Sequence, residues 1–138
     1  MRVSLAFHLI GLVLWVGGLV ILPRILKGLA PVSGQVPEVV SVARRVFFGF
    51  IVSGFVIALG TGLFQFVEGG GASVYMKQGW FHTKLTFILV LLVATALLAA
   101  ELARGKRGEA LRPGRLLAVH AMSALSLIVI TLFTFIGR

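Results

Sequence analysis

Between Arg2 and Arg24 the chain reads VSLAFHLIGLVLWVGGLVILP, residues 3–23, which is 21 residues without a charged side chain. A helix that crosses the hydrocarbon core of a bilayer needs about 20 such residues, each adding about 1.5 Å. The stretch therefore predicts a membrane-spanning helix. Two further uncharged runs, residues 46–67 and 116–137, contain 22 residues each and predict two more spans.

The remaining uncharged run, residues 85–100, is shorter, with 16 residues. It reaches roughly 24 Å, against a hydrocarbon core of about 30 Å. We expect this helix to include residues from its N-terminal side, so that His82 and Lys84 lie at the membrane boundary. The chain is then a single four-helix transmembrane domain, residues 1–138, with spans at about 3–22, 45–67, 81–102 and 116–136.

Composition excludes a water-soluble enzyme. Hydrophobic residues make up 59% of the chain, charged residues 12%, and the mean hydropathy is +1.08, which leaves too little polar surface to cover a soluble globule. The absence of cysteine excludes disulfides and thiolate metal sites. The net charge of +9 favours the lipid bilayer, rather than nucleic acid, as partner, because the basic residues punctuate apolar runs. The predicted fold is an all-α, integral membrane four-helix bundle.

Basic residues are divided unequally between the two sides of this bundle. The connection between the first two spans and that between the last two hold nine Lys and Arg residues together. The opposite side holds four: Arg2, Lys77, Lys84 and Arg138. The positive-inside rule then places both termini on the outer side and the two basic connections in the cytoplasm.

Polar side chains inside the spans are costly and therefore mark candidate functional sites. No carboxylate is expected inside a span, since the charged residues are taken as the ends of the apolar runs. One face of the first span combines an imidazole, small residues and an aromatic ring: Ser4, His8, Gly11, Trp15 and Gly18. Small residues there admit either another helix or a flat macrocycle beside an axial histidine. Helix packing accounts for the glycines but not for the histidine, so His8 is the leading candidate to bind a cofactor.

The other two histidines differ in expected depth. Odd-numbered spans run in the same direction, so His82 is placed to meet His8, unless it only forms hydrogen bonds at the interface. His120 is expected ~15 Å from His8 in depth, too far for both to bind one haem iron, and it also fits a polar helix seam. The expected depths thus favour His82 over His120 as a second metal ligand beside His8, unless that ligand position is open.

Lys84 is the remaining polar side chain at the membrane edge. It could extend its ammonium group to the headgroups, or it could serve a substrate or proton transfer. Because His82 and Lys84 are two residues apart, they point to nearly opposite sides of the helix, and one of them is expected to turn away from the bundle.

The segment FHLIGLVLWVGGL, residues 7–19, resembles the first helix of the HemJ family of bacterial membrane protoporphyrinogen IX oxidases. The resemblance continues through Pro23-Arg24, Arg44-Arg45 and Gly60-Thr61-Gly62. It is clearest at GWFHTKL, residues 79–85, which is similar to the family's Gly-Trp-x-His-x-Lys-Leu signature. Length and helix count also match, and the similarity covers roughly residues 5–100.

This resemblance implies a haem b held between the helices and the oxidation of a porphyrin substrate, protoporphyrinogen IX, with electrons passing to a quinone-type acceptor. It implies the inner (cytoplasmic) membrane of a bacterium as the location. His8 is then an axial ligand, with His82 as the second metal ligand that geometry favours. Lys84 is the candidate catalytic residue, and the further cofactor-binding candidates are Gly11, Trp15 and Arg45.

Two other functions remain open. CopD-like copper-handling membrane domains share the His-x-x-Gly and Trp-x-Gly-Gly features, although copper favours Met and Cys ligands, and here cysteine is absent and the three methionines are scattered. The chain could also be a non-catalytic subunit of a membrane complex, with histidines that only join helices. Its glycine-rich faces fit homo-oligomerisation as well.

Overall fold

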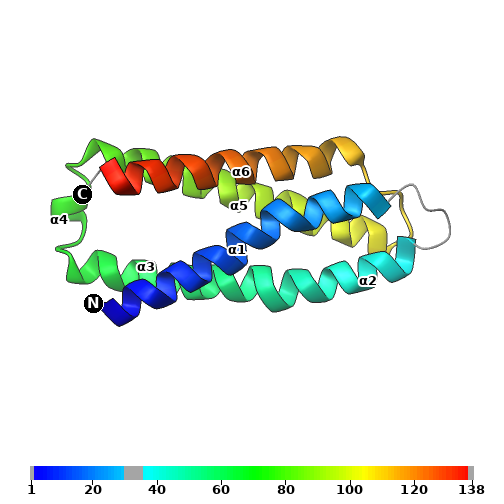
Figure 1. Ribbon diagram of the computed structural model, residues 1–138, viewed down its shortest axis with the longest axis horizontal. Helices are drawn as coiled ribbons and strands as arrows, with labels where there is room; N and C mark the ends of the chain where they lie inside the picture. Colours follow the sequence, from blue (N-terminus) through cyan, green and yellow to red (C-terminus); the bar gives the residue numbers. More distant parts are fainter. Residues whose placement is uncertain (1, 30–35, 137–138) are drawn as a thin grey trace.

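The computed structural model describes residues 2–29 and 36–136, and every long element within these ranges is a helix. Four stretches are long and apolar enough to cross a membrane: Arg2–Gly28, Glu38–Glu68, Gly79–Lys106 and Pro113–Phe133. The predicted all-α, four-span membrane fold is confirmed. The start of the first span and the end of the last lie at the same end of the bundle (Figure 1). Their placement on the outer side of the membrane stays a prediction.

The first span is α1 (Arg2–Leu29). The second consists of α2 (Val36–Val46), a π-helical segment η1 (Phe47–Val52) and α3 (Ser53–Glu68), which follow one another without a break. A short helix, α4 (Ala72–Tyr75), leads into α5 (Gly79–Lys106). The last span is α6 (Pro113–Ile136). Because α5 begins at Gly79, the third span gains its length on the N-terminal side of Lys84, as predicted.

The bundle has two unlike ends, which we name by what they carry (Figure 1). The α4 end holds α4, the start of α1 and the end of α6. The basic end holds the connection between α5 and α6 and the C-terminal part of α1, where most of the Lys and Arg residues lie. Helix α1 packs against both α3 and α6, and α5 packs against α6 and α2.

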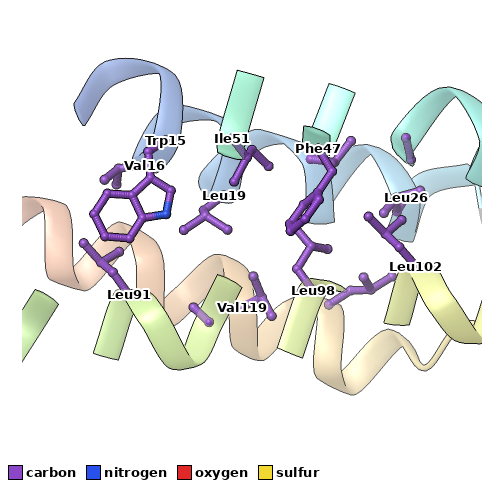
Figure 2. Close-up of a cluster of buried hydrophobic side chains, with 14 of the residues drawn as sticks. Trp15, Val16, Leu19, Leu26, Phe47, Ile51, Leu91, Leu98, Leu102 and Val119 are labelled. Atoms are coloured by element: carbon purple, nitrogen blue, oxygen red, sulfur yellow. The ribbon is translucent and has the colours of Figure 1, made fainter. Parts of the chain in front are cut away.

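The apolar core fills the basic half of the bundle and thins toward the α4 end. Figure 2 shows a large part of it, between Trp15 and Leu102. Among the described residues, the first buried side chain of α5 is Leu91, and the last buried residue of α3 is Ala58. Helices α3 and α5 diverge toward α4 (Figure 1). The side chains of α3 and α5 near α4 are therefore less buried than those in the middle of the bundle.

Helices α1 and α3 meet along a seam of small residues, Gly11, Gly54 and Ala58, which we call the α1–α3 seam. A Cβ atom added at Gly11 would lie 2.5 Å from the Ala58 backbone nitrogen and 2.9 Å from the Gly54 oxygen. One added at Gly54 would lie 2.7 Å from the Gly11 oxygen. Lipid tails are as apolar as leucine, so membrane helices associate through close packing, which small residues permit.

Glu101 is a carboxylate whose burial the pattern of uncharged runs did not indicate, and its side chain is completely buried among the helices. Its Oε1 accepts a hydrogen bond from Arg112 Nε at 2.8 Å, and its Oε2 accepts one from the Arg112 backbone N–H at 3.1 Å. Arg115 Nη1 lies 3.9 Å from Oε1. The uncharged-run analysis treated Glu101 as the end of a span. In the structure α5 continues past it, and its charge is compensated by Arg112, at the end of the connection to α6, and by Arg115, in the first turn of α6.

We predict that Gly11→Ala lowers the free energy of unfolding by about 1–3 kcal/mol, because a methyl group there must displace the α3 backbone. Gly17→Ala is the matched control on the same helix, since a Cβ at Gly17 meets no atom within 4 Å. The control should be neutral or stabilising by about 0.5–1 kcal/mol. Unfolding in detergent measures both, and equal effects would contradict the seam.

Candidate functional site

The His8 ring is held against α3 by a backbone hydrogen bond. Its Nδ1 donates to the Ala58 carbonyl oxygen at 2.9 Å and lies 3.2 Å from Thr61 Oγ1. A carbonyl oxygen only accepts, so Nδ1 carries the proton. The other nitrogen, Nε2, is then the one with a free lone pair, and it makes no hydrogen bond to the described residues. Histidines that ligate metals are commonly oriented in this way.

The local sequence of α3 explains why the ring fits there. A Cβ atom at Gly62 would lie 3.0 Å from His8 Cε1, so glycine makes room for the imidazole edge. Thr61 donates its own proton to the Ile57 carbonyl at 2.6 Å, which leaves its oxygen free to accept from His8. Thr61 and Gly62, two residues of the segment singled out by the family resemblance, therefore contact the His8 ring.

Two further polar side chains, Lys84 of α5 and Gln65 of α3, belong to the same end of the bundle as this ring. Lys84 is partly buried, and its ammonium group is close enough to His8 for the two to interact electrostatically. Gln65 lies one helical turn after Thr61, and its buried Nε2 has no hydrogen-bond partner among the described residues. A buried donor without a partner costs about 1–3 kcal/mol, so it is rare and points to a water or ligand. We call His8, Thr61, Gln65 and Lys84 the His8 cluster.

An aromatic group closes the α4 end beside this cluster. Phe66, near the end of α3, stacks on Tyr75 with 5.4 Å between ring centroids and on Phe81 of α5 at 5.7 Å. Trp80 meets Phe81 edge-on at 5.9 Å. These rings connect α3 to α5 where the buried core is thin, and aromatic side chains are typical of the membrane interface.

His82 does not join His8. Its side chain is exposed, and its Nε2 donates to the Met76 carbonyl oxygen at 2.8 Å. The histidine therefore stabilises the connection between α4 and α5. Of the two residues expected to diverge, Lys84 is the one that approaches His8.

Trp15 and Gly11 serve helix packing. Trp15 is buried, donates from Nε1 to Thr95 Oγ1 on α5 at 3.0 Å, and meets the Phe55 ring at 5.0 Å. Gly11 belongs to the α1–α3 seam. The face of α1 that the sequence offered to either a helix or a macrocycle is thus occupied by α3.

His120 joins α6 to α1. Its Nδ1 donates to the Val20 carbonyl oxygen at 2.7 Å. Pro23 lies within α1 and cannot donate to the carbonyl of Leu19, four residues before it. The His120 imidazole donates to the next carbonyl along α1, that of Val20, and so links α6 to α1 at this depth.

Arg45 lies far from the His8 cluster. It is exposed on α2 at the basic end and precedes Ala58, the residue that contacts His8, by 13 positions. At 1.5 Å per residue this is roughly 20 Å along the helix axis. Arg45 and His8 therefore cannot hold the same small group from its two sides.

Comparison of the chain with models of protein families, with curated proteins and with solved structures gave no match. In the part of the chain that the structure describes, no group of three or more His, Cys, Asp or Glu side chains is arranged to hold a metal ion. The candidate site is therefore argued from the His8 cluster alone.

The hydrogen bonds predict the neutral tautomers of the three histidines. His8 and His120 donate from Nδ1, and His82 donates from Nε2. Nitrogen-15 NMR of histidine-labelled protein in detergent should show two Nδ1–H rings and one Nε2–H ring, assigned by single His→Gln variants. A His8 ring protonated at Nε2 instead would remove the lone pair on which the site depends.

Proposed function

We propose that this protein is a membrane haem protein with protoporphyrinogen IX oxidase-like activity, in which His8 binds the haem b iron through Nε2. The observation that carries the proposal is the bond from His8 Nδ1 to the Ala58 carbonyl, which presents Nε2 as a ligand. A single imidazole suits haem, because the porphyrin itself supplies four ligands to the iron. His82 donates to the Met76 carbonyl, so in this proposal His8 is the histidine that would hold the group.

The position and the chemistry of the residues near His8 support this proposal. Beyond Ala58 of α3 and before Leu91 of α5, no described side chain of these two helices is buried, so a flat apolar group bound there would cover side chains that the chain itself leaves partly exposed. The Gln65 amide and the Lys84 ammonium are donors that suit carboxylates such as propionates. Gly11 and Trp15 support the site through helix packing, without contacting the group.

When bound, haem would carry single electrons between the substrate and a quinone-type acceptor in the membrane. The protein's part is binding, orientation and proton handling. The Ala58 carbonyl and Thr61 hold the imidazole in one orientation and one tautomer. Lys84 is the titratable side chain that approaches His8, so we assign it to hold a substrate carboxylate or to accept protons at Nζ.

A non-catalytic role in a membrane complex is favoured by a different observation. All three histidines donate to backbone carbonyls, those of Ala58, Met76 and Val20. Side chains that only join helices would do the same. The two functions differ in one measurable property, which is whether the purified protein carries a haem.

The haem proposal predicts a Soret band, with α and β bands after reduction, in the visible spectrum of the detergent-purified protein. His8→Ala should lose these bands, whereas His120→Ala should keep them, since His120 contacts Val20 at the other side of the bundle core. His8→Gly supplied with free imidazole should recover them. A wild-type spectrum from His8→Ala would exclude His8 as the ligand, and a colourless wild type would favour the non-catalytic role.

Lys84→Met should keep the haem spectrum but lose oxidation of protoporphyrinogen IX by about 10²–10⁴-fold, the usual contribution of a positioned proton-transfer group. Lys77→Met is the control, because Lys77 is an exposed lysine in the nearby connection to α5. The assay follows the fluorescence of protoporphyrin IX formed by membranes of each variant. Activity of Lys84→Met equal to that of the control would contradict the role of Lys84.

A further inference from the structure

A groove of about 500 Å³ lies between α2 and α5 at the basic end, away from the His8 cluster. Its floor is the contact between the two helices, where a Cβ at Gly105 would lie 2.5 Å from Val40 Cγ2. Arg44, Arg45 and Lys106 line its walls, together with Ser41 and Phe48. The groove is thus built on two packed helices, not on a loop.

None of the chain's four glutamates lines this groove. Glu101 and Glu109 pair with arginines of the connection between α5 and α6 and its flanks. Glu68 ends α3 at the opposite end of the bundle. Glu38, on α2, lines a separate apolar groove between α1 and α2. The acids of the chain are therefore all placed elsewhere.

The three cations of the groove lack a counter-charge. In the described ranges, the ion pairs involve other basic residues, and none includes Arg44, Arg45 or Lys106. The Arg44 guanidinium lies 5.8 Å from the centre of the Phe48 ring, a cation–π distance that holds it in the groove wall. Like charges held together repel, so an anion bound between them would be favoured.

The groove also presents an apolar ring. Phe48 lines it and is 58% exposed. A ligand that matches both features carries a phosphate group and long apolar chains. Arginine forks match phosphate oxygens in pairs, and basic clusters at the membrane surface attract anionic lipids.

We propose that this groove binds the phosphodiester headgroup of an anionic phospholipid, with Arg44, Arg45 and Lys106 around the phosphate and the acyl chains beside Phe48. The site lies roughly 20 Å along the helix axis from the contact of His8 with Ala58 and is independent of the haem proposal. The basic end would then bind an anionic lipid at one defined site, in addition to its general attraction to the membrane surface.

Native mass spectrometry of the full chain in detergent, titrated with phosphatidylglycerol or with zwitterionic phosphatidylcholine, tests this site. The groove variant carries Arg44→Gln, Arg45→Gln and Lys106→Gln. The control carries Arg24→Gln, Lys27→Gln and Arg107→Gln, which removes the same charge from the same end but outside the groove. We expect the groove variant to lose phosphatidylglycerol affinity by about tenfold or more, and the control by less than about threefold.

Three results would overturn the proposal. Equal losses in the two variants would show that only net charge matters. Equal affinity of the wild type for phosphatidylcholine would remove the need for an anionic headgroup. Inorganic phosphate bound as tightly as the lipid, with the same dependence on the groove, would assign the site to a free anion. Thermal unfolding of both variants in detergent confirms that they fold, and unchanged haem content would separate this site from His8.

Discussion

Backbone contact between α1 and α3 at Gly11 and Gly54 sets the geometry on which the other features depend. A Cβ at Gly54 would overlap the Trp15 backbone nitrogen, so the backbones of the two helices are in direct contact. Burial of apolar surface does not drive helices together in lipid. Close packing of small residues is therefore what holds α1 against α3. His8 lies one turn before Gly11, and Ala58 lies one turn after Gly54. The crossing therefore brings the imidazole to the Ala58 carbonyl.

The same crossing decides what else α1 can contact. Trp15, one turn after Gly11, passes beyond the seam and donates to Thr95 of α5, so α1 links α3 to α5 through the core. Further along, Val20 receives the hydrogen bond from His120 of α6. Helix α1 is thus the element that every other span meets. Its polar contacts with the other helices are made by His8, Trp15 and Val20, and its buried core residues begin at Trp15.

Much of the fold could be predicted from charge and hydropathy, and less of the site. Run lengths predicted four spans, and the shortness of residues 85–100 predicted that α5 begins before Lys84. Helical periodicity grouped His8 with Gly11 and Trp15, but it could not tell whether a helix or a ligand fills the face. That choice depends on α3, whose glycines at 54 and 62 complement α1 only in three dimensions. Glu101 was missed because its partners, Arg112 and Arg115, follow a turn in the chain that returns them to it.

The two halves of the bundle differ in how much of their side-chain surface is buried. The basic half contains the large buried leucines and the compensated carboxylate of Glu101, so its helices are held by contacts within the chain. The α4 half has few buried residues on α3 and α5, and there His8 Nε2 and Gln65 Nε2 make no hydrogen bond to the described residues. Buried polar atoms without a partner also occur elsewhere, at Arg104, Ser123 and Ser126, so the difference between the halves is in burial. Ligands usually bind in the less stable parts of a structure. In a fully packed region the side chains contact one another and cannot also contact a ligand. The thin core near α4 is therefore a reason to look there for chemistry, and the α1–α3 seam connects it to the half that supplies the stability.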